Sequence, residues 1–184
     1  KIIFNGPDKS TDELKRAIEN ESLIHIDHFD ELYDLIEITE TSKKKAKVAI
    51  RVNMDVGVYP LWDRFGFNYE SYQAWQAIVK IMNCDRMELV GLHCHIGTFM
   101  LTSNAYSVAA SKLCDLAYNI KLKWNKSIQY LDLGGGFAST NTLRGSYLPG
   151  SDSSPGFDDY AEAITSTILN CGFKQEDLPL LILE

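Results

Sequence analysis

Short apolar runs and amphipathic segments alternate along the whole of this chain. The apolar runs predict six strands, buried on both faces, over residues 2–4, 23–27, 47–53, 87–95, 127–133 and 180–183. Between them, apolar residues at helical spacing predict five helices, over residues 10–18, 29–39, 69–83, 102–121 and 157–170. Regular alternation of strand and helix is typical of a parallel sheet covered by helices, so the sequence predicts an α/β fold.

Turn and cap residues mark the boundaries of these elements. Ser10 and Glu13 have the spacing of a capping box at the start of the first helix, and Gly172 follows the end of the last one. Two stretches rich in turn residues, 54–66 and 141–155, are predicted to be long loops. The alternation continues across both loops, and no internal repeat or low-complexity tract accompanies it.

The number of predicted elements fits two architectures. A closed (β/α)8 barrel takes about 250 residues, and one βα unit takes about 30. The chain has 184 residues, which makes it about two units short of a barrel. An open, doubly wound sheet would not be short at this length, so length alone does not choose between the two.

Composition and charge restrict the class of protein. The chain is 45% hydrophobic and 23% charged, with a formal net charge of −7. An acidic balance argues against nucleic acid or an anionic membrane as the main partner. No apolar run reaches the roughly 20 residues that a membrane span needs. Scattered cysteines without a CxxC pattern predict reduced thiols in a cytoplasmic protein; they are Cys84, Cys94, Cys114 and Cys171.

Residues able to bind a ligand or take part in catalysis lie where the predicted strands end. In both α/β architectures ligands bind at the carboxyl ends of the strands, so residues at these positions are the candidates for a site. The candidates are Arg51, His93, His95, Gly134, Gly135, Gly136 and Glu184.

The glycines and histidines each have two explanations. Glycines 134–136 follow an apolar strand, and such a segment lets backbone N–H groups converge on a phosphate, but a tight turn also explains it. His93 and His95 alternate, so both imidazoles face one side of their strand. They fit a metal site if other ligands join them, for which His25 and His28 are candidates, or they are hydrogen-bonded core residues.

Arg51 and Glu184 leave similar alternatives. A guanidinium inside a strand must be paired, so Arg51 binds either an anionic ligand or a structural carboxylate partner. Glu184 ends an apolar run and is either a functional carboxylate or the first solvated residue after the strand.

Several stretches together resemble one known family. GLHCHIGT, LDLGGGF and the closing LILE, in this order, are similar to segments of the decarboxylases that use pyridoxal phosphate on an alanine-racemase-like barrel. This group contains the diaminopimelate, ornithine and arginine decarboxylases. NGPDKSTDEL, RVN and RFGF also resemble its barrel segments, so the similarity extends over nearly the whole chain. The resemblance implies a (β/α)8 TIM barrel that is incomplete, with about six of its eight βα units present.

The resemblance also implies roles for the candidate residues. His95 would stack on the pyridine ring of pyridoxal 5'-phosphate, with His93 beside it. Thr98 stands where the family usually has serine, near the phosphate, and Gly134, Gly135 and Gly136 match the phosphate loop. Glu184 would hold the pyridine nitrogen protonated, and Arg51 would lie in the cofactor pocket. His95 and Glu184 are thus the expected catalytic residues.

Some family features have no counterpart in residues 1–184. The lysine that carries the family's cofactor is not matched, since Lys9 lies in a different context. The PGR that follows the family's glutamate and the C-terminal β domain are also missing, and the loop after RVN is shorter than in typical diaminopimelate decarboxylases. We therefore expect 1–184 to be a partial barrel domain lacking the first two βα units, inactive alone, from a longer protein. The chain starts at Lys1 without a methionine, in agreement with this expectation.

The implied function is pyridoxal-phosphate-dependent decarboxylation of a basic or diamino acid, free or carrier-bound. The family's active sites are shared between two subunits, which implies a homodimer. Three alternatives remain. A racemase of this fold characteristically pairs the pyridine nitrogen with arginine, and Glu184 argues against it. A non-catalytic, decarboxylase-like regulator and a metal-dependent hydrolase using His93 and His95 are the other two.

Overall fold

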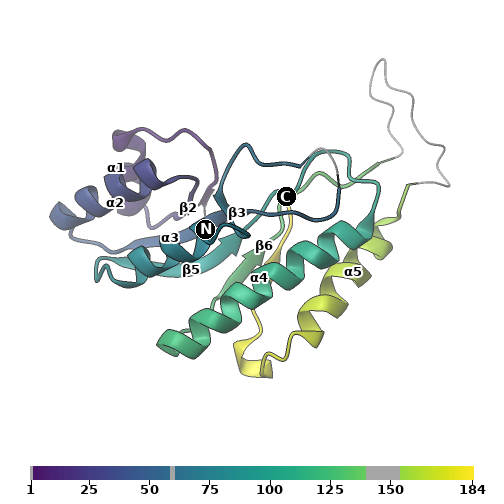
Figure 1. Ribbon diagram of the computed structural model, residues 1–184. Helices are drawn as coiled ribbons and strands as arrows, with labels where there is room; N and C mark the ends of the chain where they lie inside the picture. The colour runs from purple at the N-terminus through teal and green to yellow at the C-terminus, as the bar shows by residue number, and fades with distance from the viewer. Residues whose placement is uncertain (1, 59–60, 140–153) are drawn as a thin grey trace, which may run out of the picture.

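The computed structural model describes residues 2–58, 61–139 and 154–184, which form a curved parallel sheet with helices on one face (Figure 1). The sheet has 7 strands, six of them in the order β1-β2-β3-β5-β6-β7, while the short β4 pairs with β3 outside this path. Every pair is parallel. The strands are β1 (Ile3–Phe4), β2 (Leu23–Ile26), β3 (Ala46–Asn53), β4 (Phe67–Asn68), β5 (Met87–His93), β6 (Tyr130–Asp132) and β7 (Leu180–Ile182).

Within the described residues, five α-helices connect the six strands of this path. They are α1 (Thr11–Glu19), α2 (Phe29–Thr41), α3 (Gln73–Met82), α4 (Ser103–Trp124) and α5 (Phe157–Asn170), and a 3-10 turn (Gln175–Asp177) precedes β7. The strand order follows the sequence order, so each connection crosses over to the neighbouring strand. This is the topology of a barrel. In a doubly wound sheet, by contrast, the strand order reverses near the middle of the sheet.

The predicted elements are confirmed, with small differences at their ends. All six predicted strands and all five predicted helices are present. β4 was not predicted, because two residues are too short to show a pattern. Helix α1 has the expected capping box, in which the Ser10 side chain accepts a hydrogen bond from the Glu13 N–H. Most of the loop predicted over 141–155 lies outside the described residues.

Two apolar layers hold the sheet in place. The larger lies between the sheet and the helices and includes Leu32, Ile50, Leu92 and Leu113. The smaller lines the concave face, with Leu23, Ala49, Val90 and Tyr130 at its centre and Ile3 and Ile182 at its sides. A sheet with apolar residues on both faces and helices on the outside is the geometry of a barrel wall, so the structure is a half-barrel.

Tyr130 fills the concave face through a close approach to Gly91. A Cβ atom at residue 91 would overlap the phenol ring of Tyr130, so no residue other than glycine fits there without displacing the ring. The Tyr130 hydroxyl lies 2.9 Å from Nε2 of His25. The ring thus connects β6 to β5 by packing and to β2 by a polar contact.

Within the described residues, no helix is both long and apolar enough to cross a membrane. The four cysteines are free thiols, with Cys94 and Cys114 buried. Cys94 packs in the helix-facing layer, on the opposite side of its strand from the histidines, as the alternation predicts.

We predict that Gly91→Ala destabilises the fold by about 1–3 kcal/mol, because the added methyl group must displace the Tyr130 ring. Urea unfolding of the full chain would measure the change in free energy. Gly6→Ala is the matched control, since its Cβ would have its nearest neighbour, the Asp8 carbonyl oxygen, at 3.9 Å. Equal unfolding midpoints for the two variants would contradict the prediction.

Candidate active site

Parallel pairing brings the predicted site residues to one edge of the sheet. Arg51 pairs with His93 in register, and His93 pairs with Asp132 on the next strand. Asp132 pairs in turn with Ile182, two residues before Glu184. Figure 1 shows the loops after β3 and β5 on the same side of the molecule as the C-terminal residue. The carboxyl ends of β3, β5, β6 and β7 therefore meet at one edge of the sheet.

The glycines after β6 form a segment whose carbonyl groups are all engaged. The carbonyl of Gly134 accepts from the Glu184 N–H at 3.0 Å, and that of Gly136 accepts from the Met100 N–H at 2.9 Å. The Gly135 carbonyl accepts from the Tyr106 hydroxyl at 2.8 Å. By contrast, the N–H groups of Gly135 and Gly136 donate to no acceptor in the described part of the chain.

Side chains are excluded from this segment by its neighbours. A Cβ at residue 134 would lie 2.7 Å from the Cys94 carbonyl oxygen, and one at 135 would lie 2.7 Å from that of Glu184. At residue 136 it would overlap the Gly97 carbonyl oxygen, and φ is +86° there. Free N–H groups on a backbone segment without side chains can converge on a phosphate. These residues therefore fit the phosphate of a cofactor.

Thr98 lies beside the glycines, as the resemblance implies. Its Cα is 3.4 Å from the position that a Gly136 Cβ would occupy, and the residue is exposed. Its backbone is therefore next to the glycine segment.

His95 follows β5 and is half-buried between two neighbours. Its Nδ1 lies 3.1 Å from the position of a Gly134 Cβ, so the absence of a side chain there makes room for the ring. Trp62 approaches edge-on, with ring centroids 5.8 Å apart. Burial lowers the pKa of His95, and the positive charge of Arg51 lowers it further. The imidazole is therefore neutral near pH 7 and presents an uncharged ring.

Glu184 is held from both the backbone and the side chain. Its N–H donates to the Gly134 carbonyl, and its Oε1 accepts from Nδ2 of Asn5 at 2.7 Å. The carboxylate therefore lies across the concave face from the end of β1.

Arg51 has a carboxylate partner within the chain. Its Nη1 lies 3.5 Å from Oδ1 of Asp27, and its guanidinium lies 5.0 Å from the centroid of the Phe65 ring. Of the two alternatives from the sequence, the structure shows the structural ion pair. The place of Arg51 in a cofactor pocket stays a prediction.

A buried polar cluster lies directly beneath these residues. Nδ1 of His93 is 3.4 Å from Oδ1 of Asp132, and Nδ1 of His25 is 3.9 Å from Oδ2 of the same carboxylate. Burial lowers the pKa of His25 to about 3, with the positive charges of Lys9 and Arg51 adding to the effect. Burial raises the pKa of Asp132, but the nearby His93 imidazole and the hydrogen bond from the Gly134 N–H outweigh this, and its net pKa is lowered.

His25, His93 and Asp132 are also the kinds of side chain that bind metal ions. Among the described residues, His25, His93 and Asp132 place possible ligand atoms within 4.8 Å of one another. The other histidines are employed differently. His28 caps α2, accepting from the Glu31 N–H at 3.2 Å, and His95 lies in the layer above.

Lys9 is buried and fully engaged. Its Nζ lies 2.8 Å from Oε1 of Glu31, and it donates to the His25 carbonyl at 2.7 Å and to the Gly6 carbonyl. Burial raises the pKa of Glu31, while the ammonium of Lys9 opposes the rise. The pair joins the loop after β1 to α2, so Lys9 stabilises the fold rather than offering a free amine.

Sequence reasoning missed three residues of this site: Asn5, Asp132 and Trp62. Asn5 directly follows β1, so the rule that ligands lie at strand ends was sufficient to find it. Asp132 is a charged residue inside the apolar run YLDL, which is the signal that identified Arg51. Trp62 has no such signal, because an aromatic residue in a loop is most simply explained by packing.

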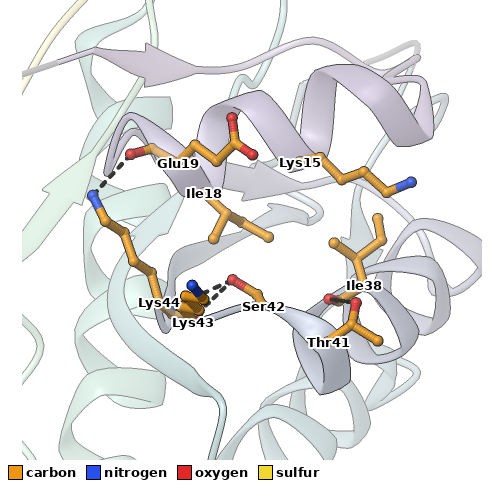
Figure 2. A pocket seen from close by; sticks show the side chains of 8 residues that line it. All are labelled: Lys15, Ile18, Glu19, Ile38, Thr41, Ser42, Lys43 and Lys44. Atoms are coloured by element: carbon orange, nitrogen blue, oxygen red, sulfur yellow. Dashed lines mark hydrogen bonds between the residues drawn. The ribbon is translucent and has the colours of Figure 1, made fainter.

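A large hollow elsewhere on the surface is unconnected with this site. It has a volume of about 450 Å³ and lies between α1 and α2 (Figure 2). Its lining includes Ile18, Ile38 and Ser42, and Lys44 at its rim donates to the Glu19 carbonyl. It opens beside the segment that leads into the amino end of β3, whereas ligands of this fold bind at the carboxyl ends.

Comparison with known proteins agrees with this geometry. Residues 1–184 match the family described as pyridoxal-dependent decarboxylase, pyridoxal binding domain. The diaminopimelate decarboxylase of Bacillus methanolicus is 34% identical over 167 residues, which cover 82% of this chain and 37% of that protein. That of Methanocaldococcus jannaschii is 31% identical, with 100% of this chain and 42% of the relative covered. The chain thus spans about two fifths of the length of these relatives.

Solved structures give the same result. The diaminopimelate decarboxylase from M. jannaschii superposes with a TM-score of 0.81 at 28% identity, over 100% of this chain and 42% of that chain. The arginine decarboxylase of Paramecium bursaria Chlorella virus, bound to agmatine, has a TM-score of 0.70 at 21% identity and shares the fold. The half-barrel, its glycine segment and the match along its whole length lead to one conclusion: the chain belongs to the pyridoxal-binding domain family of the pyridoxal-dependent decarboxylases.

Proposed function

We propose that this chain supplies the cofactor-binding wall of a pyridoxal-phosphate-dependent decarboxylase that acts on a diamino acid, with diaminopimelate as the first candidate. One observation carries the proposal. Free glycine N–H groups, a neutral imidazole and a carboxylate converge at a single edge of the half-barrel. A phosphate, an aromatic ring and a ring nitrogen each need one of these three groups.

The glycine segment binds the phosphate. The N–H groups of Gly135 and Gly136 would hold its oxygens, while the hydrogen bonds on the three glycine carbonyls keep the segment rigid. Thr98 adds a hydroxyl from the neighbouring loop. A rigid set of donors binds an anion more strongly than a flexible loop, because little conformational entropy is lost on binding.

His95 and Glu184 hold the ring. The His95 imidazole, uncharged and fixed at its edge by Trp62, provides a flat surface against which an aromatic ring stacks. Glu184 would hold the pyridine nitrogen, because a carboxylate beside that nitrogen favours its protonated form.

Pyridoxal phosphate, when bound, accepts into its ring the electron pair that remains on Cα after the carboxyl group leaves as CO2. The carboxylate of Glu184 assists by holding positive charge at the ring nitrogen. Arg51 lies near His95 and lowers its pKa, and we infer that it contributes to the electrostatics of the pocket while remaining paired with Asp27.

The proposed substrate rests on the relatives. The matching proteins from B. methanolicus and M. jannaschii are diaminopimelate decarboxylases, and a structure of the latter, 27% identical to this chain, is a complex with L-lysine. Lysine is what remains when diaminopimelate loses one carboxyl group. A diamino acid is therefore the substrate class that the relatives favour.

Glutamate at residue 184 also separates this proposal from racemization. A racemase of this fold pairs the pyridine nitrogen with arginine, which leaves that nitrogen unprotonated and the ring a weaker electron acceptor. We infer decarboxylation because a carboxylate stands at this position, joined to Asn5. A non-catalytic regulator remains the alternative if no lysine carries the cofactor.

We further propose that the active enzyme is a cytoplasmic homodimer whose sites are shared between subunits. Thr98 and Glu184 are exposed at the open edge of the half-barrel, where other parts of the protein or a second copy have room to complete the site. The half-buried thiols Cys84 and Cys171 form no disulfide, in keeping with a reducing compartment. On this proposal the cofactor-bearing lysine and a C-terminal β domain lie outside residues 1–184.

Incubating the full-length protein with pyridoxal phosphate and reducing it with borohydride should attach one pyridoxyl group, detected by intact mass. Peptide mapping should place it on a lysine other than Lys9, because the Lys9 ammonium is buried against Glu31. The adduct should persist in Lys9→Met if that variant folds. A folded protein without an adduct would favour the regulator instead.

Gly136→Ala should weaken cofactor binding about tenfold or more, since the loss of one hydrogen bond to a charged group costs about 1.5–3 kcal/mol. The physical reason is that the methyl group overlaps the Gly97 carbonyl oxygen and forces the segment to move. Fluorescence titration with the cofactor would measure the dissociation constant. Gly156→Ala is the control, because its Cβ would meet only Asp159 Oδ2, at 3.6 Å, and the proposal fails if the two variants bind alike.

A further inference from the structure

We propose that Asn5 and His93 are positioning residues, which form a chain of polar contacts from the buried Asp132 to the carboxylate of Glu184. The inference rests on the proposed role of Glu184 at the ring nitrogen and adds what holds that carboxylate in place. It also assigns a purpose to the first histidine of HCH, which the ring-stacking role of His95 leaves unexplained.

The orientation of the Asn5 amide follows from its short contact with Glu184. Nδ2 of Asn5 lies 2.7 Å from Oε1 of Glu184. With the amide reversed, its oxygen would stand at that distance from a carboxylate oxygen, and two acceptors repel each other. The NH2 group therefore faces Glu184 and donates one of its two hydrogens to it.

The second hydrogen of the same NH2 group decides the tautomer of His93. Nδ2 of Asn5 lies 3.3 Å from Nε2 of His93. Because Nδ2 carries only donors, Nε2 must be the acceptor and has no hydrogen of its own. A neutral imidazole then carries its single hydrogen on Nδ1.

Asp132 is the anchor that this tautomer requires. Its Oδ1 lies 3.4 Å from Nδ1 of His93 and accepts from the Gly134 N–H at 2.8 Å. The carboxyl group is fully buried, and its net lowered pKa keeps it ionised near pH 7. Nδ1 of His93 therefore lies beside a fixed negative charge, and among the described residues it has no other polar partner.

His25 completes the surroundings of the chain without taking part in it. Its lowered pKa leaves the imidazole neutral, and its Nε2 is engaged with the Tyr130 hydroxyl at 2.9 Å. Its ring lies 4.8 Å from that of His93 and limits the movement of His93. A metal bound by His25, His93 and Asp132 would need a free lone pair on Nδ1 of His93. In the proposed tautomer this nitrogen carries a hydrogen instead.

The polar contacts from Asp132 through His93 and Asn5 give the exposed carboxylate of Glu184 a single orientation. Glu184 is exposed and follows the short strand β7, so without a partner its side chain would sample several rotamers. Donation from Asn5 selects one of them, and His93 fixes Asn5. Outer partners of this kind typically change activity by 10–100-fold when removed.

The first test reads the tautomer without the cofactor. In the full-length protein at pH 7.5, ¹⁵N NMR of labelled histidine should show Nδ1 of His93 protonated and Nε2 unprotonated. An Nε2–H tautomer, or a signal displaced by one equivalent of added Zn²⁺, would overturn the proposal. This result is independent of the proposed function, which is judged by the borohydride adduct.

The second test follows Glu184 through the bound cofactor. Asn5→Ala should lower kcat by about 10–100-fold with little change in KM, and should move the pH dependence of the cofactor's visible absorption band towards lower pH, since the ring nitrogen loses its proton more easily. Asn119→Ala removes an exposed amide that donates only within α4, and it should leave both unchanged.

Two variants of His93 separate positioning from packing. His93→Gln keeps an acceptor where Nε2 stood, so it should retain the spectral pH profile, whereas His93→Leu should reproduce the shift of Asn5→Ala. A common profile for the two His93 variants, or an unchanged profile in Asn5→Ala, would overturn the proposal.

Discussion

The whole arrangement depends on strands that all run in one direction. Parallel pairing from β1 to β7 places every carboxyl end at the same edge, and the register from Arg51 through His93 to Asp132 keeps those ends level. Residues from distant parts of the chain therefore meet without any long-range signal in the sequence. The glycine segment after β6 and the carboxylate after β7 are neighbours because their strands are neighbours, and the loops above them have only to leave this edge accessible.

Buried charge is distributed along this edge in pairs. Lys9 with Glu31 and Arg51 with Asp27 connect the loop after β1, the end of β2 and helix α2 into one network, to which the Asp27 N–H contributes by donating to Glu31. Removing one member of such a pair leaves an uncompensated charge, which is why these residues belong to the scaffold. The site itself carries fewer fixed charges: a neutral His95 and free N–H groups, which gain their full interaction only when a charged ligand arrives.

Much of this protein could be predicted from its sequence, and the failures have physical causes. Strands and helices were predictable because each buries a periodic apolar face, and Ser10 with Glu13 marks a helix start locally. The meeting of His95, Gly136 and Glu184 followed from strand direction alone. The contacts that could not be predicted join side chains that are far apart in the sequence. The pairing of Lys9 with Glu31, the ion pair of Arg51 and the Asn5 contact join residues 22, 24 and 179 positions apart, and no local pattern specifies them.

The contact between Asn5 and Glu184 also measures the shape of the sheet. These residues follow β1 and β7, the two ends of the six-strand path, which would be about 24 Å apart if strands spaced about 4.8 Å lay flat. Their side chains nonetheless form a hydrogen bond, so this bond joins the two ends of the curved sheet across its concave face. A change in the curvature of the sheet would therefore change the distance between these two side chains. The setting of the Glu184 carboxylate is in this way coupled to the shape of the whole wall.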